Sequence, residues 1–234
     1  MSAPGWVRVT PAGCYAAVAR ERRAEAAEPA PADEAREALL ALLSREDSAR
    51  WSEAAHAALA ATGLVERAAE PERAPQAPLE RFLPGVLPGL SDRGRTVLSE
   101  SRQGLFLDCA GLSRDDAERL AATGAALFAL LGRDPLLPSE RLEVGSVALG
   151  IVDASGHAEV GFWPLFVGRY VFMLTVFGVP RFNAAGFRQL VWTLQQRYGG
   201  EAPVPGGGSD VGAAFAGAAA GAEGTVSPDD EPAA

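Results

Sequence analysis

The chain has 234 residues, 48% of them hydrophobic, and a formal net charge of −9. This is enough apolar material for one folded domain with additional segments. Residues 76–200 carry 12 Arg against 12 acidic residues, and residues 201–234 carry six acidic residues and no basic one. A balanced central part excludes the strongly basic composition of a nucleic-acid-binding domain.

The sequence also indicates where the protein resides. No apolar run approaches the roughly 18 residues of a membrane span, and the start MSAPGWVRVT lacks the pattern of a signal peptide. Cys14 and Cys109 are too far apart to suggest a disulfide framework or a metal site. We therefore expect a cytoplasmic protein with no membrane span and no nucleic acid partner.

Residues 1–69 are predicted to form an N-terminal helical extension. Trp6–Val9 reads as a short strand, residues 14–27 can be helical, and residues 33–43 form an amphipathic helix. Ser44 and Asp47 resemble a capping box for a second helix that runs to residue 61 and stops at Gly63. A helix-turn-helix fragment with residues 64–67 as a strand is the alternative, although the segment is net acidic.

Residues 70–78, EPERAPQAP, have the composition of a linker between this extension and a domain at 79–199. The domain begins with a helical stretch at 79–90. Because proline removes a backbone donor and clashes with the preceding turn, Pro84 and Pro88 predict that no regular helix extends much beyond the first turn.

A hairpin and a helix come next. Residues 96–98 and 105–109 predict two strands around the turn SRQG, and Ser113 is placed to cap a helix that runs to residue 131. Leu120, Leu127 and Phe128 supply the expected core-facing side of this helix. A band of small residues beside it includes Ala121, Gly124 and Ala125, and this band is expected to be left for a partner surface.

Three strands and a last helix complete the domain. Residues 141–153 predict a long alternating strand, residues 158–163 predict a second, and Pro164 requires an edge position or a bulge. Tyr170–Phe177, YVFMLTVF, is the most apolar run and predicts a central strand buried on both faces. Asn183 is expected to cap a helix with an apolar stripe from Phe187 to Tyr198. Residues 200–234 form a Gly/Ala/acidic tail that is expected to be disordered.

The order of these elements resembles the Roadblock/dynein light chain family, including its MglB-type bacterial members, over residues 91–198. The motifs that carry the resemblance are VLSESRQGLFLDCAGLS, DDAERLAATGAALFALL, YVFMLTVF and NAAGFRQLVWTLQQ. Positions that match the family pattern are Leu98, Gly104, Leu105, Ala110, Gly186 and Arg188. Two features depart from it: the prolines at 84 and 88 interrupt a helix that is regular in the family, and the chain is about twice the usual length. Either that helix is short, or the helix at 44–63 covers the same face of the sheet.

The resemblance implies an α/β (α+β) fold with a five-stranded antiparallel sheet flanked by helices. It also implies dimerisation, with the third strand pairing across a two-fold axis and the helix at 113–131 near its mate. The expected interface comprises Ala121, Gly124, Ala125, Phe128, Val147, Leu149 and Ile151. The implied partners are a second copy or a Roadblock-like paralogue, and a small Ras-like GTPase.

No motif indicates catalysis. His56 and His157 lack neighbours at metal-ligand spacing, Cys109 is expected to be a buried apolar residue, and Asp115 and Asp116 are explained by the helix dipole. We therefore predict a non-enzymatic interaction module with no cofactor and no metal. The alternative is a small-molecule sensor of profilin-, PAS- or GAF-like build, which requires a pocket with convergent polar groups.

Overall fold

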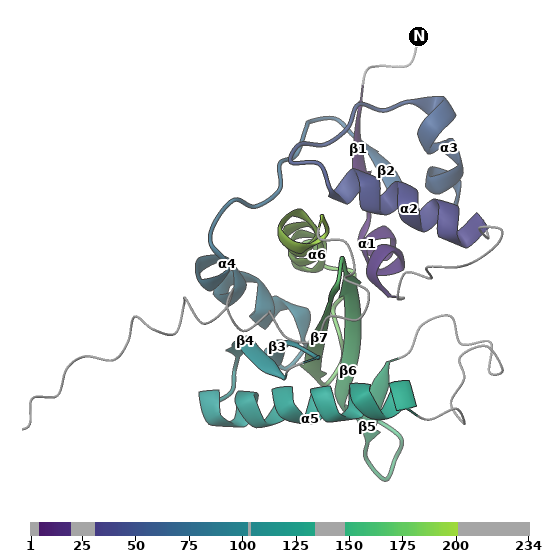
Figure 1. Ribbon diagram of the computed structural model, residues 1–234. Helices are drawn as coiled ribbons and strands as arrows, with labels where there is room; N and C mark the ends of the chain where they lie inside the picture. The colour runs from purple at the N-terminus through teal and green to yellow at the C-terminus, as the bar shows by residue number, and fades with distance from the viewer. Residues whose placement is uncertain (1–4, 20–30, 103, 134–147, 201–234) are drawn as a thin grey trace, which may run out of the picture. The chain divides into compact units, whose positions relative to one another are not determined.

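The computed structural model describes residues 5–19, 31–102, 104–133 and 148–200, so the expected tail lies outside these ranges except for Gly200. The fold is mixed α/β, with a five-stranded antiparallel sheet of order β4-β3-β7-β6-β5 and a two-stranded sheet of β1 and β2 (Figure 1). The strands are β1 (Trp6–Val9), β2 (Val65–Ala68), β3 (Thr96–Glu100), β4 (Leu105–Ala110), β5 (Leu149–Val152), β6 (Ala158–Val167) and β7 (Tyr170–Phe177). The helices are α1 (Pro11–Val18), α2 (Pro31–Leu43), α3 (Glu53–Ala61), α4 (Leu79–Val86), the 3-10 helix η1 (Leu87–Leu90), α5 (Arg114–Arg133) and α6 (Ala185–Tyr198).

Strand β7 is the centre of the large sheet, as its sequence predicts. It pairs with β3 on one side and with β6 on the other, and all of its residues except Phe177 are buried. Gly168 connects β6 to β7 with φ of 56°, a left-handed conformation that glycine adopts without steric cost. Helices therefore pack against both faces of the sheet at β7.

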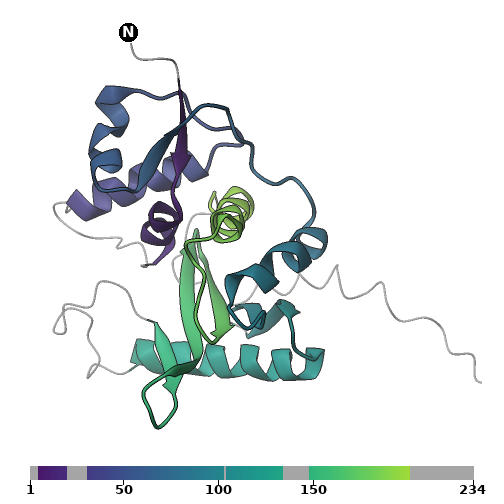
Figure 2. The ribbon, with the colours of Figure 1, turned by 180° about the vertical axis from the view of Figure 1, so that it is seen from behind.

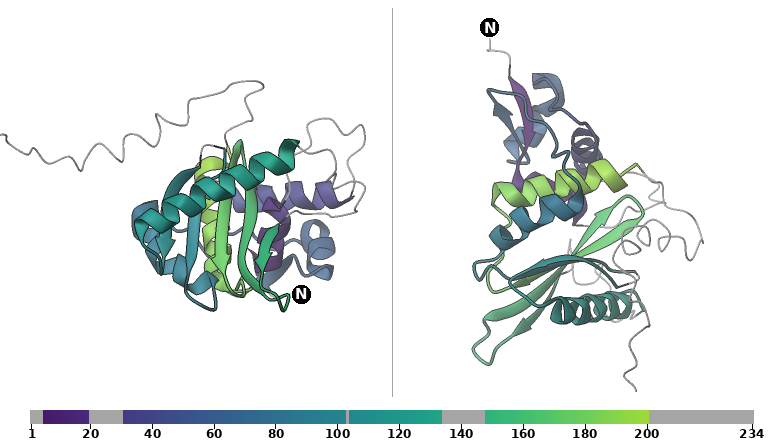
Figure 3. Two further views of the ribbon diagram at one scale, coloured as in Figure 1. Left: turned by 90° about the horizontal axis from the view of Figure 1, so that it is seen from below. Right: turned by 90° about the vertical axis from the view of Figure 1, so that its left-hand side faces the viewer.

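The β3–β4 hairpin and α5 follow the predicted order. The Ser113 hydroxyl accepts a hydrogen bond from the Asp116 backbone N–H at 3.2 Å, so Ser113 caps α5 as expected. Helix α5 runs across one face of the large sheet (Figure 3). The opposite face is covered by α4, η1, α6 and α1 (Figure 2).

Helix α4 is longer than the prolines suggested. It runs for eight residues with Pro84 inside it, and η1 continues the chain to Leu90. Pro84 is exposed while Leu79, Leu83 and Val86 are buried, so the missing backbone donor lies on the solvent side. The expected limit of about one turn was wrong, and of the two alternatives for this helix the structure shows the short one, with eight residues.

The extension covers the sheet with α1 and not with the helix expected at 44–63. Helix α1 contacts α6 and β6. The Tyr15 ring lies 6.1 Å from the Phe182 ring, which in turn stacks on Phe187 at 4.6 Å and meets Trp163 edge-on at 5.2 Å. Contacts among these rings, of which Phe187 is buried and the other three are half-buried, hold α1 on the same face as α6.

Helix α3, which the sequence predicted to begin after Ser44, is also shorter than predicted. It begins at Glu53, with Ser52 at the N-cap, so Ser44 and Asp47 form no capping box. Residues 46–48 instead pair with the segment 70–78: the Ser48 N–H donates to the Glu72 carbonyl, and the Ala74 N–H donates to the Glu46 carbonyl. Gly63 has φ of 72° directly after the helix, in agreement with its predicted role as a stop.

The N-cap of helix α6 lies one residue later than predicted. Ala184 is at the N-cap position, and no side chain caps this end, so the expected role of Asn183 was wrong. The predicted stripe is buried at Phe187, Leu190, Val191 and Leu194. On the remaining surface, the Trp192 indole N–H donates to the Arg45 carbonyl at 2.9 Å, and the Gln196 amide donates to the Leu43 carbonyl at 2.9 Å. These bonds satisfy carbonyls at and just after the C-terminus of α2.

Strand β5 spans Leu149–Val152, and residues 141–147 of the strand predicted over 141–153 lie outside the described part of the chain. Its register with β6 places Leu149 opposite Phe162 and Ile151 opposite Val160. Pro164 of β6 pairs with Met173 of β7, beyond the described end of β5. The position opposite Pro164 on the β5 side falls on residues outside the described part of the chain, so the predicted edge position or bulge at Pro164 stays a prediction.

Candidate interaction surface

The surface built by α5 and β5 is the one that the sequence singled out. Gly124 packs against the large sheet, where a Cβ atom on it would lie 3.2 Å from Met173 Cγ and 3.5 Å from Phe162 Cδ1. Leu149 is paired with Phe162 and Ile151 with Val160, so both point to the face that α5 covers. Helix and strand thus contribute to one side of the sheet.

The small residues of α5 face the sheet and not a partner. Ala117 and Ala121 have no exposed surface, and Gly124 is buried. Together with Phe128 they follow the spacing i, i+4, i+7 and i+11, which defines one helix face. The expectation that Ala121 and Gly124 belong to an outward surface was therefore wrong: their small size lets α5 approach β6 and β7 closely.

The larger side chains flank this buried face. Phe128 is half-buried, and its ring centroid lies 6.1 Å from that of Phe166. Ala125 is half-buried on the side near Gly104, whose hypothetical Cβ would lie 3.5 Å from the Ala125 Cβ. Leu120 and Leu127 are half-buried on the opposite flank by helical geometry. The predicted core-facing role of these leucines is only partly met.

Three apolar side chains remain exposed at this end of the molecule. Leu130 of α5 is 57% exposed, and Ile151 and Val152 of β5 are 54% and 58% exposed. We call Leu120, Leu127, Leu130, Leu149 and Ile151 the α5–β5 surface. Val147, the remaining predicted interface residue, lies outside the described residues. The sequence analysis did not identify Leu130 as a surface residue, although its position within the predicted helix follows from the sequence.

The edge of β5 is open in the part of the chain that the structure describes. β5 forms its ladder with β6, and no described strand pairs with its other side. Backbone N–H and C=O groups along such an edge can pair with another strand. An open edge on a strand that also carries the exposed side chain of Ile151 is an arrangement that can bind an extended or strand-forming partner.

Residues considered for chemistry are dispersed over the fold. His56 lies on α3, and its Nδ1 is 3.0 Å from the Ser52 N–H. His157 is exposed, with its Nδ1 3.7 Å from Asp153 Oδ2. Among the described residues no group of three His, Cys, Asp or Glu side chains could hold a metal ion.

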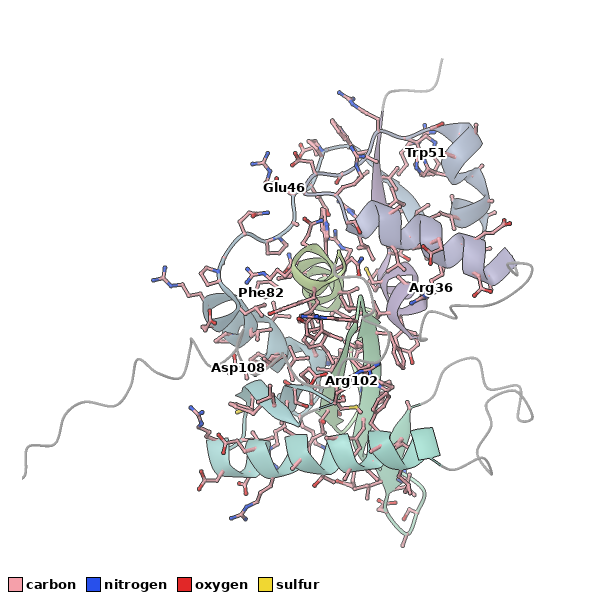
Figure 4. All side chains as sticks on the ribbon, viewed as in Figure 1. Arg36, Glu46, Trp51, Phe82, Arg102 and Asp108 are labelled. Atoms are coloured by element: carbon pink, nitrogen blue, oxygen red, sulfur yellow. The ribbon has the colours of Figure 1, made fainter. Side chains whose placement is uncertain are left out.

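Two other side chains have altered acidity. Burial raises the pKa of Asp108, although its Oδ1 accepts a hydrogen bond from the Cys109 N–H at 2.8 Å. Asp108 lies on β4, as labelled in Figure 4, and its Oδ2 is buried without a hydrogen-bond partner among the described residues. Burial also raises the pKa of Cys109, so this thiol is not an activated nucleophile.

Two cavities lined by described residues do not resemble a sensor pocket. A groove of about 450 Å³ is lined by the loops around Asp92, Asp153 and Gly178. Its charged groups are already paired: both terminal nitrogens of Arg93 contact the Glu159 carboxylate, and Asp92 accepts from the Val179 N–H. A second cavity measures about 20 Å³, far below the size of a small-molecule site.

Comparisons with family models, with curated proteins and with solved structures find no match for this chain. None of the helices in the described ranges is long and apolar enough to cross a membrane. The assignment of a function therefore depends on the geometry of the α5–β5 surface and on the sequence motifs.

Proposed function

We propose that the chain is a non-enzymatic protein-interaction module that associates through the α5–β5 surface. Its counterpart is a second copy or a Roadblock-like paralogue, and the assembly binds a small Ras-like GTPase or scaffolds a regulator of one. The observation that carries this proposal is that no described strand pairs with the outer side of β5, a strand that carries the exposed side chain of Ile151. The sequence motifs from residue 91 to residue 198 supply the GTPase part of the proposal.

The physical argument concerns the exposed edge. A strand edge with exposed apolar side chains invites uncontrolled pairing unless a specific partner covers it. Antiparallel pairing of β5 with β5 of a second copy would satisfy the open backbone groups and extend the sheet. The same approach would bring Leu127 and Leu130 of α5 against apolar surface of the mate, which removes them from water.

The opposite face of the sheet is already occupied. Helices α1, α4 and α6 cover it, and α2 contacts the outer side of α6. Because these layers belong to the same chain, a partner that contacts the sheet directly has access mainly through the α5 side. This supports the α5–β5 surface over the α6 side as the place of association.

Sedimentation velocity on the full chain tests the association. We expect a dimer at tens of micromolar, and we expect Ile151→Glu to shift it to monomer because a carboxylate would be buried at the contact. Val152→Glu is the matched control, because Val152 is equally exposed on the other face of β5. A wild-type monomer with no paralogue able to bind it, or equal effects of both substitutions, would contradict the proposal.

The GTPase part needs a separate experiment. The immobilised full chain is incubated with native cell extract in the presence of a non-hydrolysable GTP analogue or of GDP. We expect that a small GTPase is retained and that its retention depends on the nucleotide. We also expect that Ile151→Glu, or replacement of Leu130 by a charged residue, abolishes this retention. Retention of no GTPase under either condition would refute this part without affecting the sedimentation result.

A further inference from the structure

A cluster of charged side chains joins the extension to α6. The carboxylate of Glu72, in the segment 70–78, forms an ion pair with Arg8 of β1, with 2.6 Å between Arg8 Nη2 and Glu72 Oε1. It forms a second ion pair with Arg188 of α6. Arg8 also pairs with Glu66 of β2 at 3.2 Å. The two arginines and two glutamates balance in charge. We call Arg8, Glu66, Glu72 and Arg188 the ion cluster.

A small cavity lies at this cluster. It measures about 20 Å³ and is lined by Arg8, Glu72 and Arg188 together with Ser48, Ala49, Trp192, Val7, Val9, Leu42 and Leu43. A cavity needs roughly 10–15 Å³ on this measure to hold one water molecule, and the water needs two to four polar partners. The lining therefore has room for one such molecule, and it includes the polar side chains of Arg8, Ser48, Glu72 and Arg188.

One polar atom of the cluster lacks a partner. Arg8 Nε is buried, and no described residue accepts a hydrogen bond from it. Its terminal nitrogens are engaged by Glu66 and Glu72. A buried donor left without an acceptor destabilises the fold, and more so when the donor belongs to a charged group. A small molecule with a hydrogen-bond acceptor would therefore satisfy Arg8 Nε.

We propose that the cavity is a binding site for a single structural water molecule. The water accepts the hydrogen bond from Arg8 Nε and donates to the Glu72 carboxylate or to the Ser48 hydroxyl. A halide ion would also fit by size, but the Glu72 carboxylate would repel it, and both arginines already have carboxylate partners. The bound water completes a continuous polar connection from β1 through Glu72 to α6.

A crystal structure of the full chain tests the site directly. We expect density for one water within 2.7–3.2 Å of Arg8 Nε. A crystal soaked in sodium bromide should show no anomalous peak in the cavity. An empty cavity, a side chain in it, or a bromide peak would each overturn the proposal.

A double-mutant cycle tests the energetic role of the water. Val7→Ile adds a methylene group to a residue that lines the cavity, which displaces the water and leaves Arg8 Nε without an acceptor. We expect the unfolding equilibrium constant to rise about tenfold, which corresponds to about 1.4 kcal/mol. In an Arg8→Met background, which removes the donor, the same substitution should change it by less than about threefold.

The alternatives give different results. If the cavity is dry, Val7→Ile fills a void and stabilises the wild-type background. If the penalty comes from overpacking, it persists unchanged in the Arg8→Met background. Either result would contradict the water site, and neither depends on whether the chain dimerises or binds a GTPase.

Discussion

Gly124 of α5 lies directly over Met173 of β7, and a Cβ atom placed on Gly124 would be 3.2 Å from the Met173 Cγ. This contact is closer than most side chains tolerate, and it explains a glycine in the middle of a helix, where glycine costs about 1 kcal/mol relative to alanine. Gly124 is therefore part of the packing between helix and sheet.

We predict that Gly124→Leu destabilises the monomer by about 1–3 kcal/mol or more, because the leucine must displace Met173 and Phe162. Ala126→Leu is the matched control, since Ala126 is exposed on the same helix, and it should change stability by less than about 0.5 kcal/mol. Urea unfolding followed by circular dichroism measures both. Equal stability of Gly124→Leu and the parent would show that α5 does not pack as described.

The sequence predicted the helix that contains Gly124 but not which face of that helix contacts the sheet. The period of the apolar residues established α5 and β7, and the turn residues located the hairpins, because these signals are local. Which face of α5 meets the sheet depends on how closely two backbones approach. Here Ala117, Ala121 and Gly124 made a closer contact possible than Leu120 and Leu127 would allow. A choice between two helix faces of similar apolarity requires the tertiary contact itself.

The position of the extension was unpredictable for a related reason. Tyr15 stands in a segment rich in alanine, and its burial against Phe182 and Phe187 joins residues about 170 positions apart. The segment 70–78 has the composition of a linker, yet Glu72 and Ala74 are held by backbone hydrogen bonds to residues 46–48. Composition describes what a segment can do alone and carries no information on such long-range partners.

Asp108 supplies a prediction about pH. Because burial raises its pKa in the folded state, the ionised carboxylate opposes folding, and this cost is fully present above the folded-state pKa. The cost disappears as the pH falls below the unfolded-state pKa of about 3.9. Asp108→Asn should therefore raise the melting temperature at pH 7, and its advantage should shrink as the pH approaches about 4.

Calorimetric scans between pH 3.5 and pH 8 would measure this dependence. The control is Asp115→Asn at the exposed start of α5, where the carboxylate interacts favourably with the helix dipole, so this substitution should be neutral or slightly destabilising. A pH-independent effect of Asp108→Asn would indicate that its carboxylate is solvated like an ordinary surface group.

The two cysteines should differ in reactivity. Burial raises the pKa of Cys14 to about 12, and its side chain has no exposed surface, so it is protonated and inaccessible at pH 8. Cys109 is only half-buried. We expect a native-state assay with a chromogenic disulfide reagent to modify Cys109 first, and Cys14 only at the rate of unfolding. Cys109→Ser should then leave a chain with almost no reactive thiol in the native state, and rapid labelling of that variant would show that α1 detaches readily.

The last prediction concerns Glu72, which receives ion pairs from Arg8 and Arg188. The Arg188 side chain is only 12% exposed, so Glu72→Gln would leave a largely buried guanidinium without its carboxylate. Removing one partner of a buried pair typically costs about 3–5 kcal/mol, and partial exposure of Glu72 should place the loss near the lower end of that range.

Asp47→Asn is the matched control: Asp47 pairs with Arg73 at 2.8 Å near the same segment, but both side chains are more than half exposed. Exposed pairs contribute little to stability because water and salt screen them, so this control should be nearly silent. Urea denaturation of both variants would measure the difference. Added salt should diminish the small effect of Asp47→Asn and leave most of the effect of Glu72→Gln, because buried charges are screened less than exposed ones. Equal and small losses for the two variants would mean that the extension is held to α6 by its aromatic contacts and helix capping, without a net contribution from the ion cluster.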